Sequence, residues 1–86
     1  MPNPVYEGAN GTNVTSTTTI EGKQLLGIFV STASSAPTIA VGDGATAKIA
    51  AFVPLPGVFY PMPMEMQTDI TITIANNVDC CVFWNK

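Results

Sequence analysis

Apolar and polar residues alternate along much of the chain, and the clearest run lies in its last third. Residues 69–74 read Asp-Ile-Thr-Ile-Thr-Ile, which places three isoleucines on one face of a strand and two threonines on the other. Asn76-Asn77 predicts a turn, because Asn tolerates the left-handed backbone region. Residues 78–84 are again apolar and β-prone. The pattern therefore predicts a closing hairpin with one face in the core.

Weaker signals of the same kind predict strands upstream. Residues 14–20 are rich in β-branched side chains and predict one strand. Gly42-Asp43-Gly44 is a strong hairpin signal between the short apolar runs 38–41 and 48–53. Residues 24–31 are too continuously apolar for a half-exposed strand, so we expect the core to cover one face and a neighbouring subunit the other.

The segment that begins at residue 58 contains Pro61 and Pro63. Proline cannot donate to a strand ladder, so this segment should lie at a sheet edge or cross between sheets. No segment has helical periodicity with caps. Together these segments predict an all-β protein, a small antiparallel β-sandwich or jelly-roll-like barrel of six to seven short strands. Residues 14–86 form its single domain.

Residues 1–13 predict an extended N-terminal arm. Pro2, Pro4 and several Gly and Asn residues oppose regular structure there, and Val5 and Tyr6 are the only sizeable apolar side chains. A segment of this kind is either disordered or ordered by docking on a neighbour. In the second case Val5 and Tyr6 are the candidate contacts.

Charged residues make up 10% of the 86 residues, less than half the share in ordinary soluble domains, about 25%. A chain this short gains stability from disulfides, metals or oligomerisation. A weakly charged surface rich in Thr and Ala suits burial against neighbours. We therefore expect a homo-oligomer, with a trimer favoured.

The net charge of −3, from six acidic residues against three lysines, argues against direct binding to nucleic acid or to anionic membranes. The apolar runs are too short to span a bilayer, and no signal peptide is visible. Synthesis in a reducing cytoplasm is the simplest expectation.

The sequence contains no motif that supports a catalytic function. The chain has no His, its acids are scattered, and no residue set has metal-ligand spacing or a phosphate-binding loop. Cys80 and Cys81 are adjacent, which is unsuited to a disulfide on a strand. We expect two free thiols, one facing the core and one facing away, and we expect no catalytic residue, cofactor or metal.

Candidate partner-contact residues come from the aromatic and methionine content. Met62, Met64 and Met66 recur with period 2 on an extended segment, so they share one face. They are either core fillers or an adaptable contact surface, and Tyr60 would join either role. Trp84 is either a plug that closes the sandwich or an interface anchor.

Several segments, taken in order, resemble short proteins encoded among the structural genes of tailed bacteriophages. They are Gln24-Leu25-Leu26-Gly27-Ile28-Phe29-Val30-Ser31, then residues 37–44, then Gly57-Val58-Phe59-Tyr60-Pro61-Met62-Pro63, and finally 70–72 and 78–84. The resemblance covers about residues 24–84 and departs at Gln67-Thr68, where a Gly-rich turn is common in such sequences.

The resemblance implies a virion component. Its first implication is a capsid decoration, or cement, protein on the capsid surface that stabilises the shell by binding major capsid subunits. The alternatives are a tail, neck or fibre component that binds other virion proteins, or a carbohydrate-binding β-sandwich module on the virion. For the last, Trp84 with Asn85 or Tyr60 with Glu65 would supply the sugar contacts.

Overall fold

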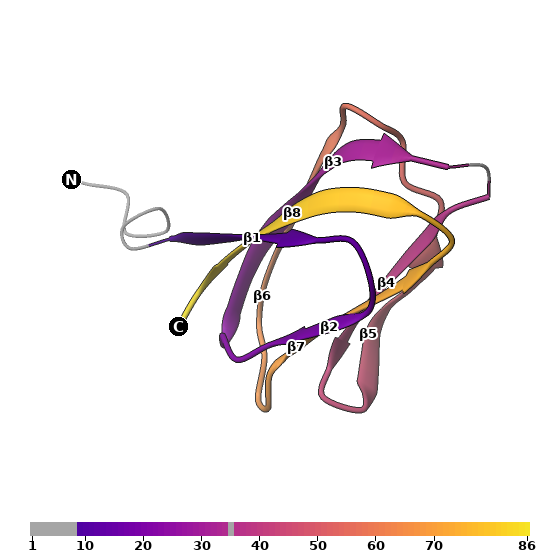
Figure 1. Ribbon diagram of the computed structural model, residues 1–86. Helices are drawn as coiled ribbons and strands as arrows, with labels where there is room; N and C mark the ends of the chain where they lie inside the picture. The colour runs from indigo at the N-terminus through magenta and orange to yellow at the C-terminus, as the bar shows by residue number, and fades with distance from the viewer. Residues whose placement is uncertain (1–8, 35) are drawn as a thin grey trace.

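The computed structural model describes residues 9–34 and 36–86, whose eight strands form two sheets packed face to face (Figure 1). The first sheet has the order β1-β8-β3-β6 and the second β2-β7-β4-β5. Every strand pair is antiparallel. The strands are β1 (Asn10–Val14), β2 (Thr18–Ile20), β3 (Gln24–Ala33), β4 (Thr38–Asp43), β5 (Thr46–Phe52), β6 (Phe59–Glu65), β7 (Ile70–Ala75) and β8 (Val78–Asn85).

The sequence prediction of an all-β sandwich is confirmed, with eight strands where six or seven were expected. No strand pair joins the two sheets within the described residues, so the sandwich does not close into a barrel. The first strand pairs with the last, the second with the second-last, and so on to the middle of the chain: β1 with β8, β2 with β7, β3 with β6 and β4 with β5. The chain ends beside its own first strand as a result.

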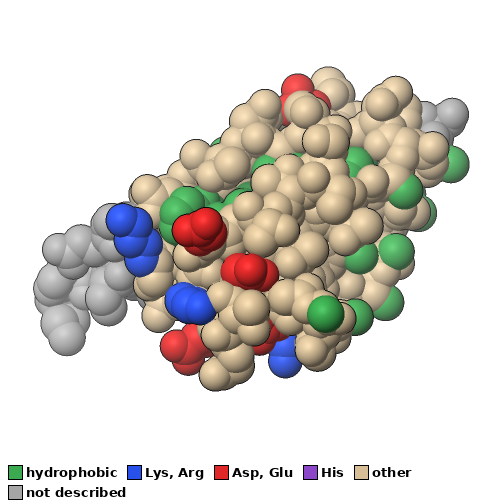
Figure 2. Space-filling model, turned by 60° about the horizontal axis from the view of Figure 1, so that its bottom comes forward, with side chains coloured by type: hydrophobic (Ala, Val, Ile, Leu, Met, Phe, Trp, Pro, Cys, Tyr) green, Lys and Arg blue, Asp and Glu red, His purple; other side chains and the backbone are tan. Residues whose placement is uncertain are grey.

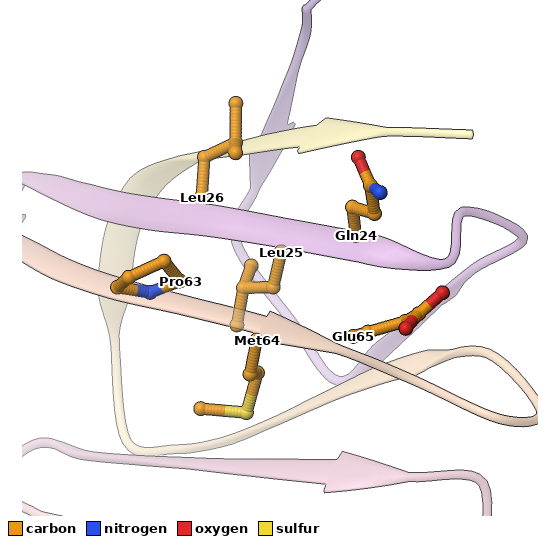
Figure 3. Close-up of a pocket in the computed structure, with 6 residues that line it drawn as sticks. All are labelled: Gln24, Leu25, Leu26, Pro63, Met64 and Glu65. Carbon is orange, nitrogen blue, oxygen red and sulfur yellow. The ribbon is translucent and has the colours of Figure 1, made fainter. Parts of the chain in front are cut away.

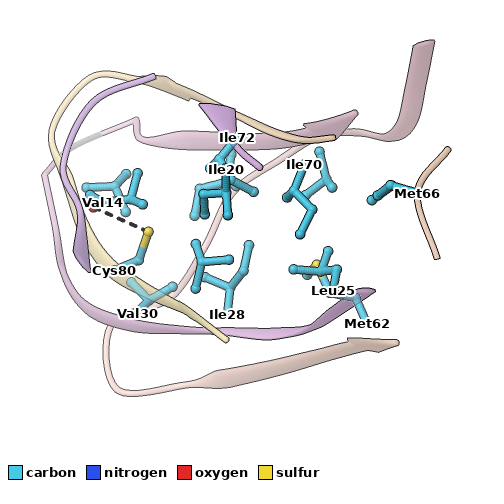
Figure 4. Close-up of a cluster of buried hydrophobic side chains, with 14 residues drawn as sticks. Val14, Ile20, Leu25, Ile28, Val30, Met62, Met66, Ile70, Ile72 and Cys80 are labelled. Atoms are coloured by element: carbon cyan, nitrogen blue, oxygen red, sulfur yellow. Dashed lines mark hydrogen bonds between the residues drawn. The ribbon is translucent and has the colours of Figure 1, made fainter. Parts of the chain in front are cut away.

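The core lies between the sheets and is built from alternate residues of nearly every strand (Figure 4). Ile20 and Ile72 of the second sheet point toward Ile28 of the first (Figure 4). The buried hydrophobic side chains are Val14, Ile20, Leu25, Ile28, Val30, Ile39, Val41, Met62, Met66, Ile70, Ile72, Val78, Cys80 and Val82. Burying each large side chain of this kind contributes about 1.5–3 kcal/mol, so this layer is the main source of stability.

The strongest sequence signals are confirmed. Ile70 and Ile72 are fully buried in β7, and Ile74 is half-buried against the core. The predicted turns have left-handed residues where they were expected, with φ 63° at Asn76 and φ 58° at Gly44. β6 continues through both prolines and lies at the open edge of its sheet. Of the two expectations for that segment, the edge strand is therefore confirmed.

Two expectations about the first twenty residues are wrong. Residues 10–13 were assigned to the arm, but with Val14 they form β1, which pairs with β8 from Asn10↔Trp84 to Val14↔Cys80. Residues 14–20 were expected to form one strand, but the chain leaves the first sheet after Val14 and enters the second at Thr18. Hydroxyl groups stabilise the crossing, since Thr18 Oγ1 donates to the Ser16 carbonyl at 2.8 Å.

Two features of β3 and its neighbours explain why residues 24–31 are apolar without a simple alternation. β3 has a bulge between Leu25 and Gly27 in its pairing with β8, which breaks the simple alternation at Leu26. Part of its outer face is covered by the Phe59 side chain from the neighbouring strand β6. A Cβ added to Gly27 would lie 2.5 Å from Phe59 Cζ and 2.8 Å from the Tyr60 carbonyl oxygen, so the Phe59 ring rests on this glycine.

Candidate interaction surface

The connecting loops gather at two opposite ends of the sandwich. One end holds the turns 21–23, 44–45 and 66–69, together with the C-terminal residue, and we call it the charged end. The other holds the connections 15–17, 53–58 and 76–77 and the described residues 34, 36 and 37, and we call it the uncharged end because none of these residues is charged.

The charges of the described residues are distributed very unevenly between the two ends. Seven of the eight charged side chains outside the undescribed segment lie at or next to the charged end, and only Asp79 lies near the other. On the face that Figure 2 shows, most red and blue groups lie on the left half, whereas green side chains appear on both halves, several of them along the right edge. The seven are Glu21, Lys23, Asp43, Lys48, Glu65, Asp69 and Lys86.

At the charged end, Asp43 fastens two turns together. Its carboxylate accepts hydrogen bonds from the backbone N–H groups of Gln67 and Thr68, both at 2.7 Å, while only 7% of the residue is exposed. These backbone donors hold the pKa of Asp43 below its ordinary value, because they stabilise the ionised carboxylate. The Lys23 ammonium donates to the Gln67 and Thr68 carbonyls. These two charged side chains therefore stabilise the turns of the charged end through hydrogen bonds within the chain.

At the uncharged end, the loop between β5 and β6 is held firmly in place. Its Pro54 is fully buried, and Gly57 has φ 80° and donates its N–H to the Val30 carbonyl at 2.7 Å. The Leu55 N–H donates to Tyr60 Oη at 2.8 Å. The Tyr60 ring is fixed by an edge contact with Phe52 at 5.2 Å between ring centres.

The same loop presents the most exposed large hydrophobic side chains of the described protein. Val53 is 62% exposed and Leu55 is 59% exposed, while Pro54 between them points into the molecule. A loop whose backbone is already ordered loses little conformational entropy when a partner binds. We call Val53 and Leu55 with their fixed backbone the apolar loop.

A second apolar area lies on the outer face of the first sheet. Phe29, Phe59 and Phe83 form it, with Phe29 37% exposed and Phe59 46% exposed. Phe59 packs edge-on against Phe83 at 5.9 Å. Phe29 faces Phe59 across the β3–β6 pair. Ordinary monomers also expose apolar patches, so this aromatic face by itself identifies no partner.

The candidate contact residues from the sequence fall into four groups, of which Trp84 forms the last. Met62 and Met66 are buried in the core and Met64 packs against it, so all three do share one face and the structure favours the core-filling interpretation. Tyr60 is half-buried, and its hydroxyl supports the apolar loop. Val5 and Tyr6 lie outside the described residues.

Trp84 behaves as a plug at the charged end of the sandwich. It is half-buried, and its Nε1–H donates to Thr12 Oγ1 at 2.9 Å. A Cβ added to Gly22 would lie 2.2 Å from the indole ring. The rings of Trp84 and Tyr60 thus both make contacts within the chain, and the pairings of Trp84 with Asn85 and of Tyr60 with Glu65 as sugar contacts stay predictions.

A shallow hollow lies beside β3 and β6 at the charged end (Figure 3). Its volume is about 220 Å³, smaller than the roughly 300–1,000 Å³ of typical ligand pockets. Gln24 and Leu26 point to one side of the sheet and Met64 to the other. The hollow therefore offers one carboxylate, Glu65, and one amide, without a second acid facing them.

Both cysteines are free thiols, as expected, with Cys80 buried and Cys81 half-buried on the opposite face. Burial raises the pKa of Cys80 to about 11. Within residues 9–34 and 36–86, no three His, Cys, Asp or Glu side chains are placed to hold a metal ion. The same part of the chain contains no helix with the length and hydropathy needed to cross a membrane.

The chain matches no protein-family model, no curated protein and no solved structure. Sequence reasoning missed Val53 and Leu55, because Val53 was assigned to the apolar strand 48–53 and the four residues after it only to the end of that strand. The alternation of proline with a large aliphatic residue in Val-Pro-Leu-Pro was the available signal for a stiff loop, since proline fixes φ, but it does not predict which side chains face outward.

Proposed function

We propose that this protein is a non-catalytic structural component of a tailed-phage virion, a capsid decoration protein that binds major capsid subunits and stabilises the shell. The observation that carries the proposal is the uncharged end with its rigid apolar loop. Burial of such a surface against another protein desolvates no charge, and a preformed backbone lowers the entropic cost of docking.

The fold supports the proposal by analogy. Pairing of strands from the outside of the chain inward, across two four-stranded sheets, is the arrangement we class as a jelly roll. Jelly rolls occur in viral capsid and lectin domains, although a fold alone does not determine a function. The low charge content supports a position on the capsid surface among neighbouring copies and capsid subunits.

The contribution of the apolar loop can be estimated from its exposure. Full burial of Leu contributes about 1.5–3 kcal/mol, and 59% of Leu55 is still exposed, so docking would gain about 1–2 kcal/mol from this side chain. Leu55→Ser should therefore weaken binding to the shell by roughly five- to thirtyfold. Gln67→Ser, in an exposed turn at the charged end, is the matched control and should change binding little.

The test uses particles from a phage deleted for the gene, with purified protein added back. We expect the wild-type protein to co-sediment with filled heads at a fixed ratio and to raise the temperature at which the heads release DNA. Binding to isolated tails and not to heads would overturn the capsid assignment in favour of a tail component. Absence of the protein from whole virions would overturn the virion role altogether.

A further inference from the structure

The four edge strands of the sandwich differ in how well they are protected against pairing with another strand. Proteins protect open edges with prolines, bulges, lysines or very short strands. β6 contains Pro61 and Pro63. β5 carries Lys48 and has two register shifts in its pairing with β4. β2 has three residues.

β1 has none of these protections. It is five residues long, contains no proline and no charged residue, and pairs with β8 without a register shift. Its longer polar side chains are turned back toward β8: Asn13 Nδ2 donates to Asp79 Oδ1 at 2.7 Å, and Thr12 Oγ1 accepts from Trp84 at 2.9 Å. The outer backbone edge of Gly11–Val14 is therefore kept clear of its own side chains.

We propose that β1 is a docking edge for a second copy of this chain, which adds its own β1 in antiparallel orientation. With Thr12 opposite Thr12 of the other copy, the two first sheets become one continuous eight-stranded sheet. Among the described strands each molecule has a single unprotected edge, so a two-fold pair uses both of these edges and leaves neither open to further growth. The edge carries no charge, so self-pairing brings no like charges together, and threonine pairs across strands are favourable.

The size of this contact indicates how strong it is. Five strand residues extend about 17 Å, so the paired edges cover much less than the roughly 800 Å² per partner of a standard stable interface. The pair should form reversibly and depend on concentration. In this orientation Asn10 of each copy lies opposite Val14 of the other. A two-fold pair takes the place of the trimer expected from the sequence.

The test uses the purified full chain alone, so it is independent of the virion proposal. Analytical ultracentrifugation up to about 1 mM should show reversible association to twice the 9.0 kDa chain mass. Hydrogen exchange should show backbone amides of residues 11–14 that become protected as concentration rises, while those of residues 47–51 do not.

Two lysine substitutions provide the matched pair. Asn13→Lys places a charge on the unprotected edge and should raise the dissociation constant at least about tenfold. Thr46→Lys places the same charge on the protected edge of β5 and should change it less than about twofold. Both variants must keep the wild-type melting temperature at low concentration, and Asn13→Asp, which also places a charge on this edge, serves in place of Asn13→Lys if that variant does not fold.

Four outcomes would overturn the inference. They are a monomer at every concentration, a trimer, an equal effect of the two lysines, and concentration-independent exchange in residues 11–14. A monomer that nonetheless binds phage heads would refute self-pairing and leave the proposed function intact.

Discussion

Replacing Ile72 with Ala tests whether the core between the sheets is the main source of stability. Ile72 is 0% exposed in the middle of β7, where its backbone pairs with both Thr18 and Val41. The substitution removes three carbon atoms, each worth about 0.8 kcal/mol of transfer free energy, or about 2.4 kcal/mol together. A residual cavity between two sheets that cannot collapse raises the expected loss to about 3–5 kcal/mol.

This loss is large for a chain of this size. At about 0.05–0.15 kcal/mol per residue, 86 residues give a total stability of about 4–13 kcal/mol. Ile72→Val, which removes a single carbon atom, should cost only about 0.5–1.5 kcal/mol and remains measurable if the Ala variant does not fold. Thr73→Ala changes the next, exposed residue of the same strand and should cost about 0.5 kcal/mol or less.

The measurement is urea unfolding followed by circular dichroism at one fixed protein concentration, with the free energy of unfolding compared among the three variants. A loss below about 1 kcal/mol for Ile72→Ala would refute the estimate, because it would mean that the site relaxes fully. Similar losses at Ile72 and Thr73 would refute the assignment of an open outer face, and would indicate that a partner covers the second sheet.

Three further predictions concern single sites. Gly27→Ala should destabilise the protein by about 1–3 kcal/mol in thermal or urea unfolding, because its Cβ would meet the Tyr60 carbonyl at 2.8 Å; an unchanged stability would contradict the close approach of β6. The lowered pKa of Asp43 means that its ionised form stabilises the fold above the unfolded pKa and that this contribution is lost as the pH falls through the folded pKa. Acid titration of the melting temperature should therefore show a loss below about pH 4 that Asp43→Asn reduces, and an identical acid profile in both proteins would refute the role of this carboxylate. Cys80, with its pKa raised to about 11, should resist alkylation at pH 8 until the chain is unfolded in urea, whereas Cys81 should react in the folded protein; equal rates by intact mass would show that Cys80 is accessible.

The sequence predicted those elements whose signals are local. The alternation in β7, the turn at Asn76 and the Gly-Asp-Gly hairpin are each fixed by residues close together in the chain. β1 was missed because Asn-Gly-Thr-Asn has low β-propensity, and its strand exists through pairing with β8, some seventy residues away. The crossing after Val14 was missed because both sides of it are equally β-prone.

The candidate surface was less predictable than the fold. Whether a leucine in a loop is buried or exposed depends on which elements pack around it, and residues 54–57 gave only a turn signal. Leu55 is exposed because Pro54 fills the space beneath and Tyr60 Oη holds the loop backbone. The methionine series shows the converse, since its shared face was predictable from period 2 but its direction, into the core, was not.

The position of β8 inside the first sheet has a consequence for how the chain folds. β8 lies between β1 and β3, so β1 has no strand to pair with until residues 78–85 are available. Because synthesis proceeds at about 5–20 residues per second, the earlier strands keep unpaired edges until β8 has been synthesised. Sheets built from such distant pairings then fold on the millisecond-to-second scale. Nascent chains that end before Val78 should therefore be the form most exposed to aggregation and to chaperones, and folding should be completed only after the last strand has left the ribosome.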